Sequence, residues 1–123
     1  DDIKEGTAVS NAFLEDQAGS LTLELDNLVA KTLSLGKDPF NSDKEFFLDV
    51  LNVREQGAML TLKATQSAML HQGAKGYLMT AHPQRRLREA QFVAIVTPAI
   101  KHLRYLSHQL MDEPKVKPIE YFI

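Results

Sequence analysis

The first clear pattern along the chain is a strict alternation of polar and apolar residues over residues 20–25. A period of two is typical of a half-buried strand. Three leucines of this run are expected to face the core: Leu21, Leu23 and Leu25. A helix is the competing interpretation, because leucine favours helices and the apolar positions continue at Leu28 and Val29. We take a short strand as the leading prediction.

A short helix is predicted to follow this strand, over residues 27–35. Asp26 is its expected N-terminal cap. Gly36 is its expected stop, in the left-handed conformation that glycine adopts without strain. Residues 37–41 contain Asp, Pro and Asn and are predicted to form a turn before the next element.

The third predicted element is a long helix with a well-defined polar stripe. Ser42 and Glu45, three residues apart, match a capping box at its start. We expect this helix to end near His71, with Gly73 and Gly76 as its stop. Gly57 in its interior predicts the close approach of another helix. The polar stripe comprises Glu45, Asp49, Asn52, Gln56, Lys63 and Gln66, and the apolar face comprises Phe46, Phe47, Val50, Leu51, Val53, Ala58, Leu62 and Met69.

The last part of the chain predicts a helical region interrupted by proline. Residues 73–82 are expected to form a connector, and Pro83 suits the first turn of the helix that follows. Pro98 is expected to kink that helix or to split it in two. Apolar positions in steps of four and three predict a packing seam: Phe92, Val96, Ala99, Leu103, Leu106 and Leu110.

Together these elements predict a mainly α fold with one short strand. We expect a single domain over residues 1–123, made of a strand–helix–helix unit (19–72), an additional helical region (83–112) and a tail (113–123). A lone strand leaves its backbone N–H and C=O groups unpaired and therefore demands a partner strand. The order strand, helix, helix is that of ribbon-helix-helix proteins, whose paired strands enter the major groove of DNA. The expected assembly is a ribbon-helix-helix-like homodimer with extra C-terminal helices.

The composition indicates the class of protein and its cellular compartment. The chain has 123 residues, 44% of them hydrophobic, and no cysteine, so it has neither disulfides nor cysteine-ligated metal. It also lacks the long apolar run of a membrane-spanning helix. We therefore expect a cytoplasmic protein that does not enter the membrane. The chain begins at Asp1 without methionine, which we interpret as a processed or trimmed start.

Charge is distributed unevenly along the chain. Residues 1–62 carry five basic and twelve acidic residues, whereas residues 63–123 carry nine basic and four acidic ones, giving the net charge of −2. Such a basic half attracts phosphates or an acidic partner. An acidic half that packs against a basic half within the same assembly is an equally good interpretation.

No pattern of catalytic or metal-binding residues stands out. The four histidines do not have the spacing of a helical zinc site, and the glycines form no phosphate-binding loop or nucleophile elbow. The acidic residues near the start of the long helix are expected to act as capping and solvated-face residues. We therefore predict no enzymatic activity, no cofactor and no metal.

Nucleic-acid binding is the function that the charged residues favour. The densest basic cluster lies at the start of the last helical region, where positive charge opposes the helix dipole. Arginine is well suited to clamp phosphates. The alternative is a solvated helix start whose arginines pair with acids of the first half. The candidate DNA contacts are Ser20, Thr22, Lys31, Ser42, Lys44, Arg85, Arg86, Arg88, Lys101 and Arg104.

Two of these candidates have a specific expected role in a ribbon-helix-helix dimer. Thr22, on the outward side of the predicted strand, is the expected base or phosphate contact. The free N–H groups at the cap residue Ser42, with Lys44 nearby, are suited to hold a phosphate. Glu24 and Asp26 oppose this placement, because acidic side chains are unfavourable beside phosphates.

Residues 19–35 also resemble a segment of AcaB-like transcriptional activators of conjugative plasmids and integrative conjugative elements. The shared pattern is an alternating apolar run that leads into an aspartate, then Leu-Val, then a further leucine. It is carried here by Leu21, Leu23, Asp26, Leu28, Val29 and Leu33. The resemblance implies a homodimeric DNA-binding regulator of conjugative transfer genes, with Thr22 in the groove. The resemblance reaches from Gly19 to the first turns of the long helix, so it assigns no role to the arginines that follow Gly73.

Two functions follow from these observations. The leading hypothesis is a dimeric, sequence-specific, DNA-binding transcriptional activator that contacts double-stranded DNA. The alternative is a helical protein-interaction or assembly subunit whose basic half docks an acidic partner.

Overall fold

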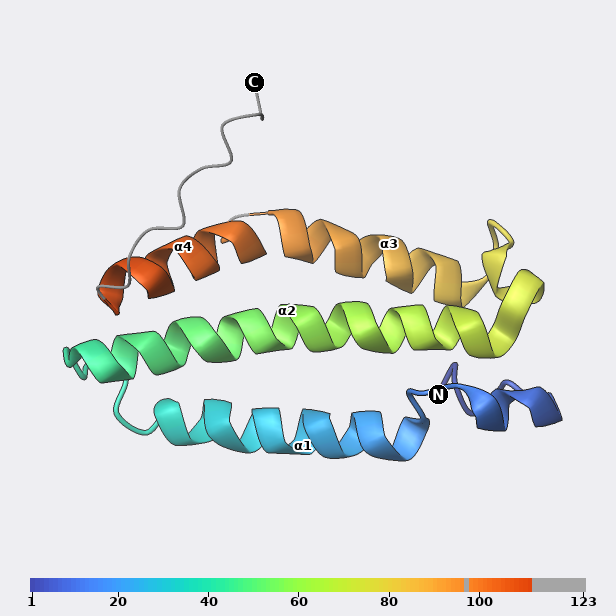
Figure 1. Cartoon of the computed structure of the whole chain (residues 1–123), viewed down its shortest axis with the longest axis horizontal. Coiled ribbons are helices and arrows are strands. Elements are labelled where there is room, and N and C mark those ends of the chain that lie inside the picture. The colour runs from blue at the N-terminus through green and yellow to red at the C-terminus, as the bar shows by residue number, and fades with distance from the viewer. Residues whose placement is uncertain (97, 112–123) are drawn as a thin grey trace, which may run out of the picture.

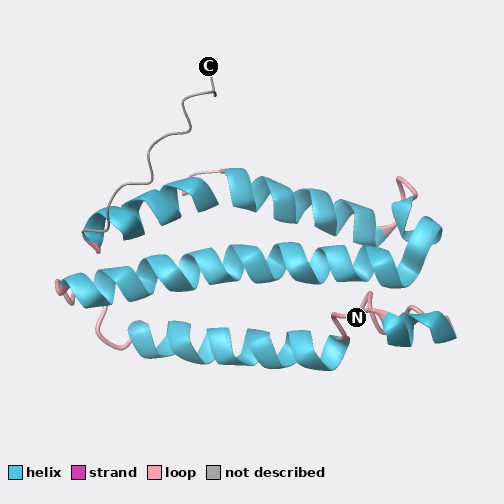
Figure 2. Cartoon of the chain, in the orientation of Figure 1, coloured by secondary structure: helices cyan, strands magenta, loops and turns pink. Residues whose placement is uncertain are grey.

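The computed structural model describes residues 1–96 and 98–111, and every regular element in these ranges is helical (Figure 2). The predicted tail (113–123) lies outside the described residues. The elements in chain order are two short 3₁₀ helices and four α-helices: η1 (Val9–Phe13), α1 (Ala18–Leu35), α2 (Lys44–Gln72), η2 (Gly73–Tyr77), α3 (His82–Ile95) and α4 (Ile100–Leu110).

The helices form a layer with α2 in the middle (Figure 1). The helix α1 packs along one side of α2, and α3 and α4 pack one after the other along the opposite side. The core therefore consists of two narrow strips, one on each side of α2. Its buried apolar residues are Leu21, Leu51, Ala58, Ala68, Ala90, Ala99 and Leu103.

The strand predicted over residues 20–25 is wrong, because these residues form the first turns of α1. Leu21 is buried, whereas Leu23 and Leu25 are exposed, so the leucines do not share one face. A helix satisfies its own backbone hydrogen bonds, and its period also brings Leu28 against α2. The ribbon-helix-helix arrangement, which depends on this strand, is therefore not present in the described chain.

The predicted ends of the neighbouring helices also need correction. Asp26 caps no short helix, because it lies inside α1. Gly36 does follow the last residue of α1, but its φ of −66° is right-handed. Its amide donates to the carbonyl oxygen of Thr32 at 3.0 Å, which continues the helical pattern into the turn. Ser42 is not the cap of α2: the helix begins one residue later than the capping box predicts, with Asp43 as its N-cap.

The long helix is the element that the sequence predicts best. It ends at Gln72, and Gly73 follows with a φ of +63° that an L side chain rarely adopts. The predicted approach of another helix at Gly57 is confirmed, because a Cβ added there would lie 3.7 Å from Leu28 of α1. The six residues of the predicted polar stripe are all exposed.

The two prolines of the last region act as predicted. Pro83 lies in the first turn of α3, and the helical region splits between Ile95 and Ile100, around Pro98. The predicted seam is only partly correct. Ala99 and Leu103 are buried against α2, whereas Phe92 is exposed.

Candidate interaction surfaces

The predicted DNA-contact residues do not gather on one surface. Ser20, Thr22 and Lys31 are exposed on α1, and α2 separates them from the basic residues of α3 and α4. Ser42 precedes α2, and Lys44 is its first residue. The hydroxyl of Ser20 donates to the carbonyl oxygen of Gln17 at 2.9 Å within the first turn of α1. The candidates are thus divided between two sides of the layer.

Three of the candidate arginines form ion pairs within the chain. Arg86 pairs with Asp2, and Nε of Arg104 lies 2.5 Å from a carboxylate oxygen of Glu55. Arg85 pairs with Glu89 one turn further along α3, at 3.4 Å. Two of these pairs join the basic second half of the chain to its acidic first half. The uneven charge distribution therefore has, at least in part, an internal structural role.

The other candidate cations of α3 and α4 lie beside exposed apolar side chains. Arg88 and Lys101 have no ion pair within residues 1–96 and 98–111. Phe92, Ile95 and Tyr105 are exposed. These five residues lie on the side of α3 and α4 away from the buried Ala90 and Leu103 that face α2, and we call them the outer side of α3–α4.

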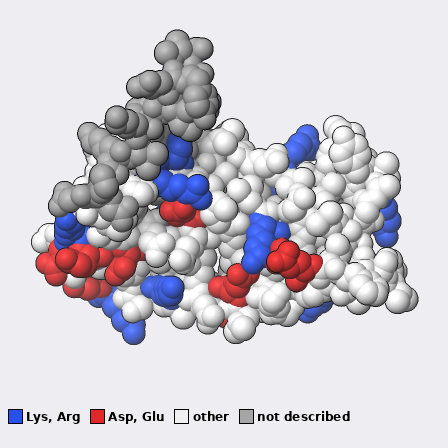
Figure 3. Space-filling view, viewed as in Figure 1, with Lys and Arg blue, Asp and Glu red and all other residues white. Residues whose placement is uncertain are grey.

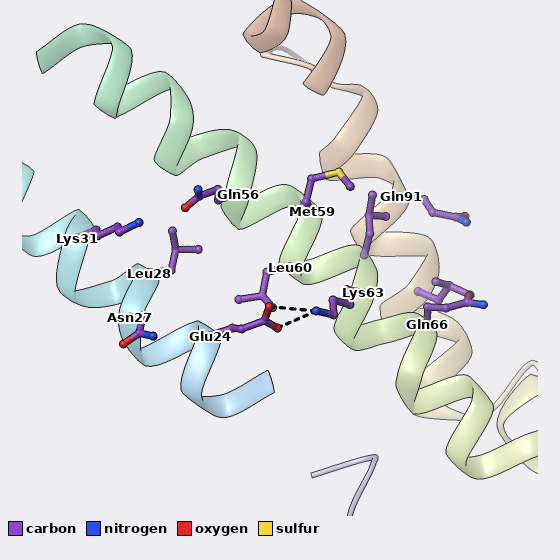
Figure 4. A pocket seen from close by; sticks show the side chains of 12 residues that line it. Glu24, Asn27, Leu28, Lys31, Gln56, Met59, Leu60, Lys63, Gln66 and Gln91 are labelled. Atoms are coloured by element: carbon purple, nitrogen blue, oxygen red, sulfur yellow. Dashed lines mark hydrogen bonds and ion pairs between the residues drawn. The ribbon is translucent and has the colours of Figure 1, made fainter. Parts of the chain in front are cut away.

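A groove on one face of the layer runs between α1, α2 and α3 (Figure 4). It has a volume of about 790 Å³. Its apolar lining is Leu28, Met59, Leu60, Leu62 and Leu87, and its polar rim is Glu24, Asn27, Lys31, Gln56, Lys63, Gln66 and Gln91. The polar rim consists mainly of amides, which bind through hydrogen bonds and do not exchange protons near neutral pH.

Lys63 joins α1 to α2 at the rim of this groove. Its Nζ donates to both carboxylate oxygens of Glu24, at 3.0 and 3.1 Å, and lies 3.5 Å from Asp16 (Figure 4 shows the Glu24 contact). The hydrogen bond to Glu24, and then the charges of Asp16 and Glu24, raise the pKa of Lys63 above its ordinary value of 10.5. All three groups are largely solvent-accessible, so this contact orients the helices more than it stabilises them.

Charges of both signs are interspersed on the face of the molecule that Figure 3 shows. Blue Lys and Arg side chains lie next to red Asp and Glu side chains in the left and central parts of this view, and no broad basic surface is visible there. A continuous basic surface is the usual electrostatic footprint of a protein that binds the DNA backbone. This face does not have one.

A polar network fastens the N-terminal segment to the end of α2, and the sequence reasoning missed it. His71 is buried, and its Nδ1 lies 2.8 Å from the carbonyl oxygen of Ser67. The amide of Gln17 donates to two backbone carbonyls, which turns its oxygen toward Nε2 of His71 at 3.3 Å. The hydroxyl of Ser67 donates to the carbonyl oxygen of Asp16 at 2.7 Å. The spacing of four between Ser67 and His71 was the available signal, but the partners lie over 50 residues away.

The described residues contain no group of three His, Asp or Glu side chains that could hold a metal ion. No helix among them is long and apolar enough to cross a bilayer. The surfaces that the structure offers are therefore an amide-rimmed groove and several exposed apolar sides of helices.

A comparison of the chain with protein-family models, with curated protein sequences and with solved structures finds no match. The resemblance of residues 19–35 to AcaB-like activators stays a prediction. Inference about function therefore rests on the surfaces of this chain alone.

Proposed function

We propose that the chain is a helical protein-interaction subunit that binds an acidic partner protein along the outer side of α3–α4. The observation that carries this proposal is that Phe92, Ile95 and Tyr105 are exposed there beside two cations without ion pairs, Arg88 and Lys101. The proposal involves no catalysis and no cofactor. It places the protein in the cytoplasm, which the absence of cysteine favours.

The composition of this surface supports a protein partner. Aromatic residues and arginine are enriched in the buried centres of protein interfaces, where they supply most of the binding energy. Covering Phe92 and Tyr105 removes large apolar areas from water at little conformational cost. Arg88 and Lys101 add a positive potential that accelerates the approach of an acidic surface.

The DNA-binding hypothesis stays a prediction, and the structure gives it less support than the sequence does. Its proposed reading element was the strand at residues 20–25, which is helical. The arginines that were to clamp phosphates include Arg85, Arg86 and Arg104, all of which have acidic partners in the chain. Regulation of conjugative transfer genes rests only on the local resemblance.

Site-specific photo-crosslinking in the native cell tests the proposal directly. A photoreactive phenylalanine analogue is placed at Phe92, and a control analogue is placed at Gln66 on the groove side of α2. We expect the Phe92 probe to cross-link one protein that the Gln66 probe does not. That protein is then purified and its affinity for the full chain is measured.

Charge reversal identifies the cations involved. We expect Arg88→Glu with Lys101→Glu to weaken binding of the cross-linked partner at least about tenfold, more strongly at low salt than at high salt. Lys31→Glu with Lys37→Glu is the matched control, because it makes the same change in net charge on exposed lysines that lie outside the outer side of α3–α4. Equal effects of the two double variants, or no protein cross-linked at Phe92, would contradict the proposal. Sequence-specific DNA binding that is lost in the first double variant alone would support the DNA hypothesis instead.

A further inference from the structure

The side of α1 and α2 opposite the groove carries an almost uncharged surface. Residues two positions apart on a helix lie about 200° apart around its axis. Leu25 and Val29 therefore point away from the groove residues Asn27 and Lys31. We call this surface the uncharged face and define it by Leu25, Val29, Leu33, Phe47 and Val50, which are 50, 46, 66, 46 and 37% exposed.

Two hollows open on this face. One is lined by Leu21, Thr22 and Leu25 of α1 together with Thr61 and Thr65 of α2, and has a volume of about 480 Å³. The other lies at the far end of the pair, has a volume of about 800 Å³, and is lined by residues that include Leu35, Phe47, Val50 and Leu110. An apolar face with hollows at both ends is suited to receive side chains from a second layer of helices.

Three threonine hydroxyls on this face already have hydrogen-bond acceptors within their own helices. The hydroxyls of Thr32, Thr61 and Thr65 each donate to the carbonyl oxygen four residues earlier in their own helix, at 2.8 Å. A hydroxyl bonded in this way leaves no donor that needs water when the face is covered. The uncharged face can therefore be buried with little loss of hydrogen bonds.

The accessible area of the chain is larger than that of an average folded monomer of its mass. The surface of 9248 Å² compares with about 6600 Å² for a folded monomer of this mass. The 13 residues outside the described ranges contribute at most about 2100 Å², which is the area of an unfolded chain of their mass. At least about 7100 Å² therefore belongs to the 110 described residues, for which the folded-monomer relation gives about 6100 Å². The excess of about 1000 Å² compares with the roughly 800 Å² that each partner of a standard interface buries.

Asp1 and Lys4 line the first hollow and Lys44 lines the second, and two further charges of opposite sign border the uncharged face. Asp26 lies one turn from Val29 on α1, and the half-buried Arg54 lies one turn from Val50 on α2. Neither has an ion-pair partner within residues 1–96 and 98–111. In a two-fold dimer the same patch is used by both subunits, so Asp26 of each copy can face Arg54 of the other. An acid and a base placed in this way are complementary to each other across a two-fold axis.

We propose that the uncharged face is the homodimer interface of this protein, with a second copy of the chain packed on it and Asp26 paired with Arg54 in both directions. This dimer differs from the predicted one, because it joins helical faces and not strands. It does not depend on the outer side of α3–α4, so the two proposals can fail independently.

Sedimentation equilibrium of the full chain over a wide concentration range tests the dimer. We expect a mass of twice 13.8 kDa at high concentration and of 13.8 kDa after dilution. Leu25→Glu with Val29→Glu is expected to weaken dimerisation more than about 100-fold, because it buries uncompensated charge. Leu23→Glu, on the same helix but outside the face, is the control and is expected to change the dissociation constant less than about threefold. Far-UV circular dichroism confirms that each variant stays helical.

Charge exchange then tests the proposed pairing. Asp26→Arg and Arg54→Asp are each expected to weaken the dimer about tenfold or more, and the double variant is expected to restore it to within about threefold of the original. A chain that stays monomeric at every concentration overturns the proposal. So does a dimer that the face variants leave intact, that Leu23→Glu disrupts equally, or that the exchanged pair does not rescue.

Discussion

Replacing Leu21 and Leu23 separately by alanine distinguishes a helix from a strand at residues 20–25. In a strand both leucines face the core, so both substitutions have similar costs. In α1 the two side chains lie about 200° apart, and their exposed fractions are 6% for Leu21 and 62% for Leu23. The two variants remove the same atoms from the same helix, so only burial separates them.

The expected magnitudes differ several-fold. Leu21→Ala removes a buried side chain from the strip between α1 and α2, which costs about 2–5 kcal/mol of unfolding free energy. The side chain of Leu23 is mostly exposed to water in the folded chain, so Leu23→Ala lowers the free energy of unfolding by less than about 1 kcal/mol. The higher helix propensity of alanine offsets part of that second cost.

Urea denaturation followed by far-UV circular dichroism measures both changes. The protein concentration must be the same in each experiment, because self-association raises the apparent stability. We expect the midpoint to fall strongly for Leu21→Ala and barely for Leu23→Ala, with an unchanged slope. Equal losses for the two variants would refute the helical assignment and restore the strand.

Three further predictions concern the ends and contacts of the helices. Gly73→Ala is expected to lower the free energy of unfolding, measured by urea denaturation, by about 1–3 kcal/mol, because the φ of +63° strains an L side chain. Gly19 has open space around it, so Gly19→Ala is expected to leave the stability unchanged or to raise it. Leu103→Ala, in the strip between α2 and α4, is expected to lower the free energy of unfolding by about 2–5 kcal/mol, and Leu106→Ala by less than half of that. Equal losses in the same urea experiment would mean that α4 does not pack on α2 as described. Since its carboxylate partners raise the pKa of Lys63, their contribution to stability is present below pH 10.5 and is lost as the pH rises through the raised value. The stability difference between the parent and Lys63→Gln, measured at pH 7 and above pH 11, is therefore expected to shrink at the higher pH, and a constant difference would contradict the assignment.

Sequence reasoning succeeded where the signal is local. Pro98 breaks a helix wherever it lies, and Gly73 ends α2 because few other residues adopt its backbone conformation. The polar stripe of α2 is long enough for its period to be read without ambiguity. Such features need no knowledge of the neighbouring helices.

The incorrect predictions concern features that are determined by contacts between residues far apart in the sequence. Six alternating residues fit both a strand and two turns of helix, and only the packing of Leu21 and Leu28 on α2 selects the helix. Phe92 was placed in a seam that continues through Pro98, but a break in a helix resets its phase. The side chains before and after the break therefore need not share a face, and Phe92 is exposed while Leu103 is buried.

Contacts between residues far apart in the sequence also decide which surfaces stay exposed, so the sequence does not predict those surfaces. The apolar positions of α1 and α3 show that these helices pack against other elements, but their periodicity does not identify which helix each one contacts. The structure shows that α2 covers only one side of each, which leaves Leu25, Val29 and Phe92 exposed. Ion pairs such as Arg86 with Asp2 are equally invisible, because their partners are 84 residues apart.

The two proposals follow from one geometric property of the fold. A layer one helix thick buries only the sides of each helix that face a neighbour, and here small residues such as Ala58, Ala90 and Ala99 occupy much of those sides. Large apolar side chains are left on the two faces and on the outer flanks, where none of the described helices covers them and another chain can do so. The proposed dimer uses one face of α1 and α2, so it leaves the outer side of α3–α4 free on both copies. Such a dimer presents two identical partner sites and binds a bivalent partner with greater avidity than a single chain does.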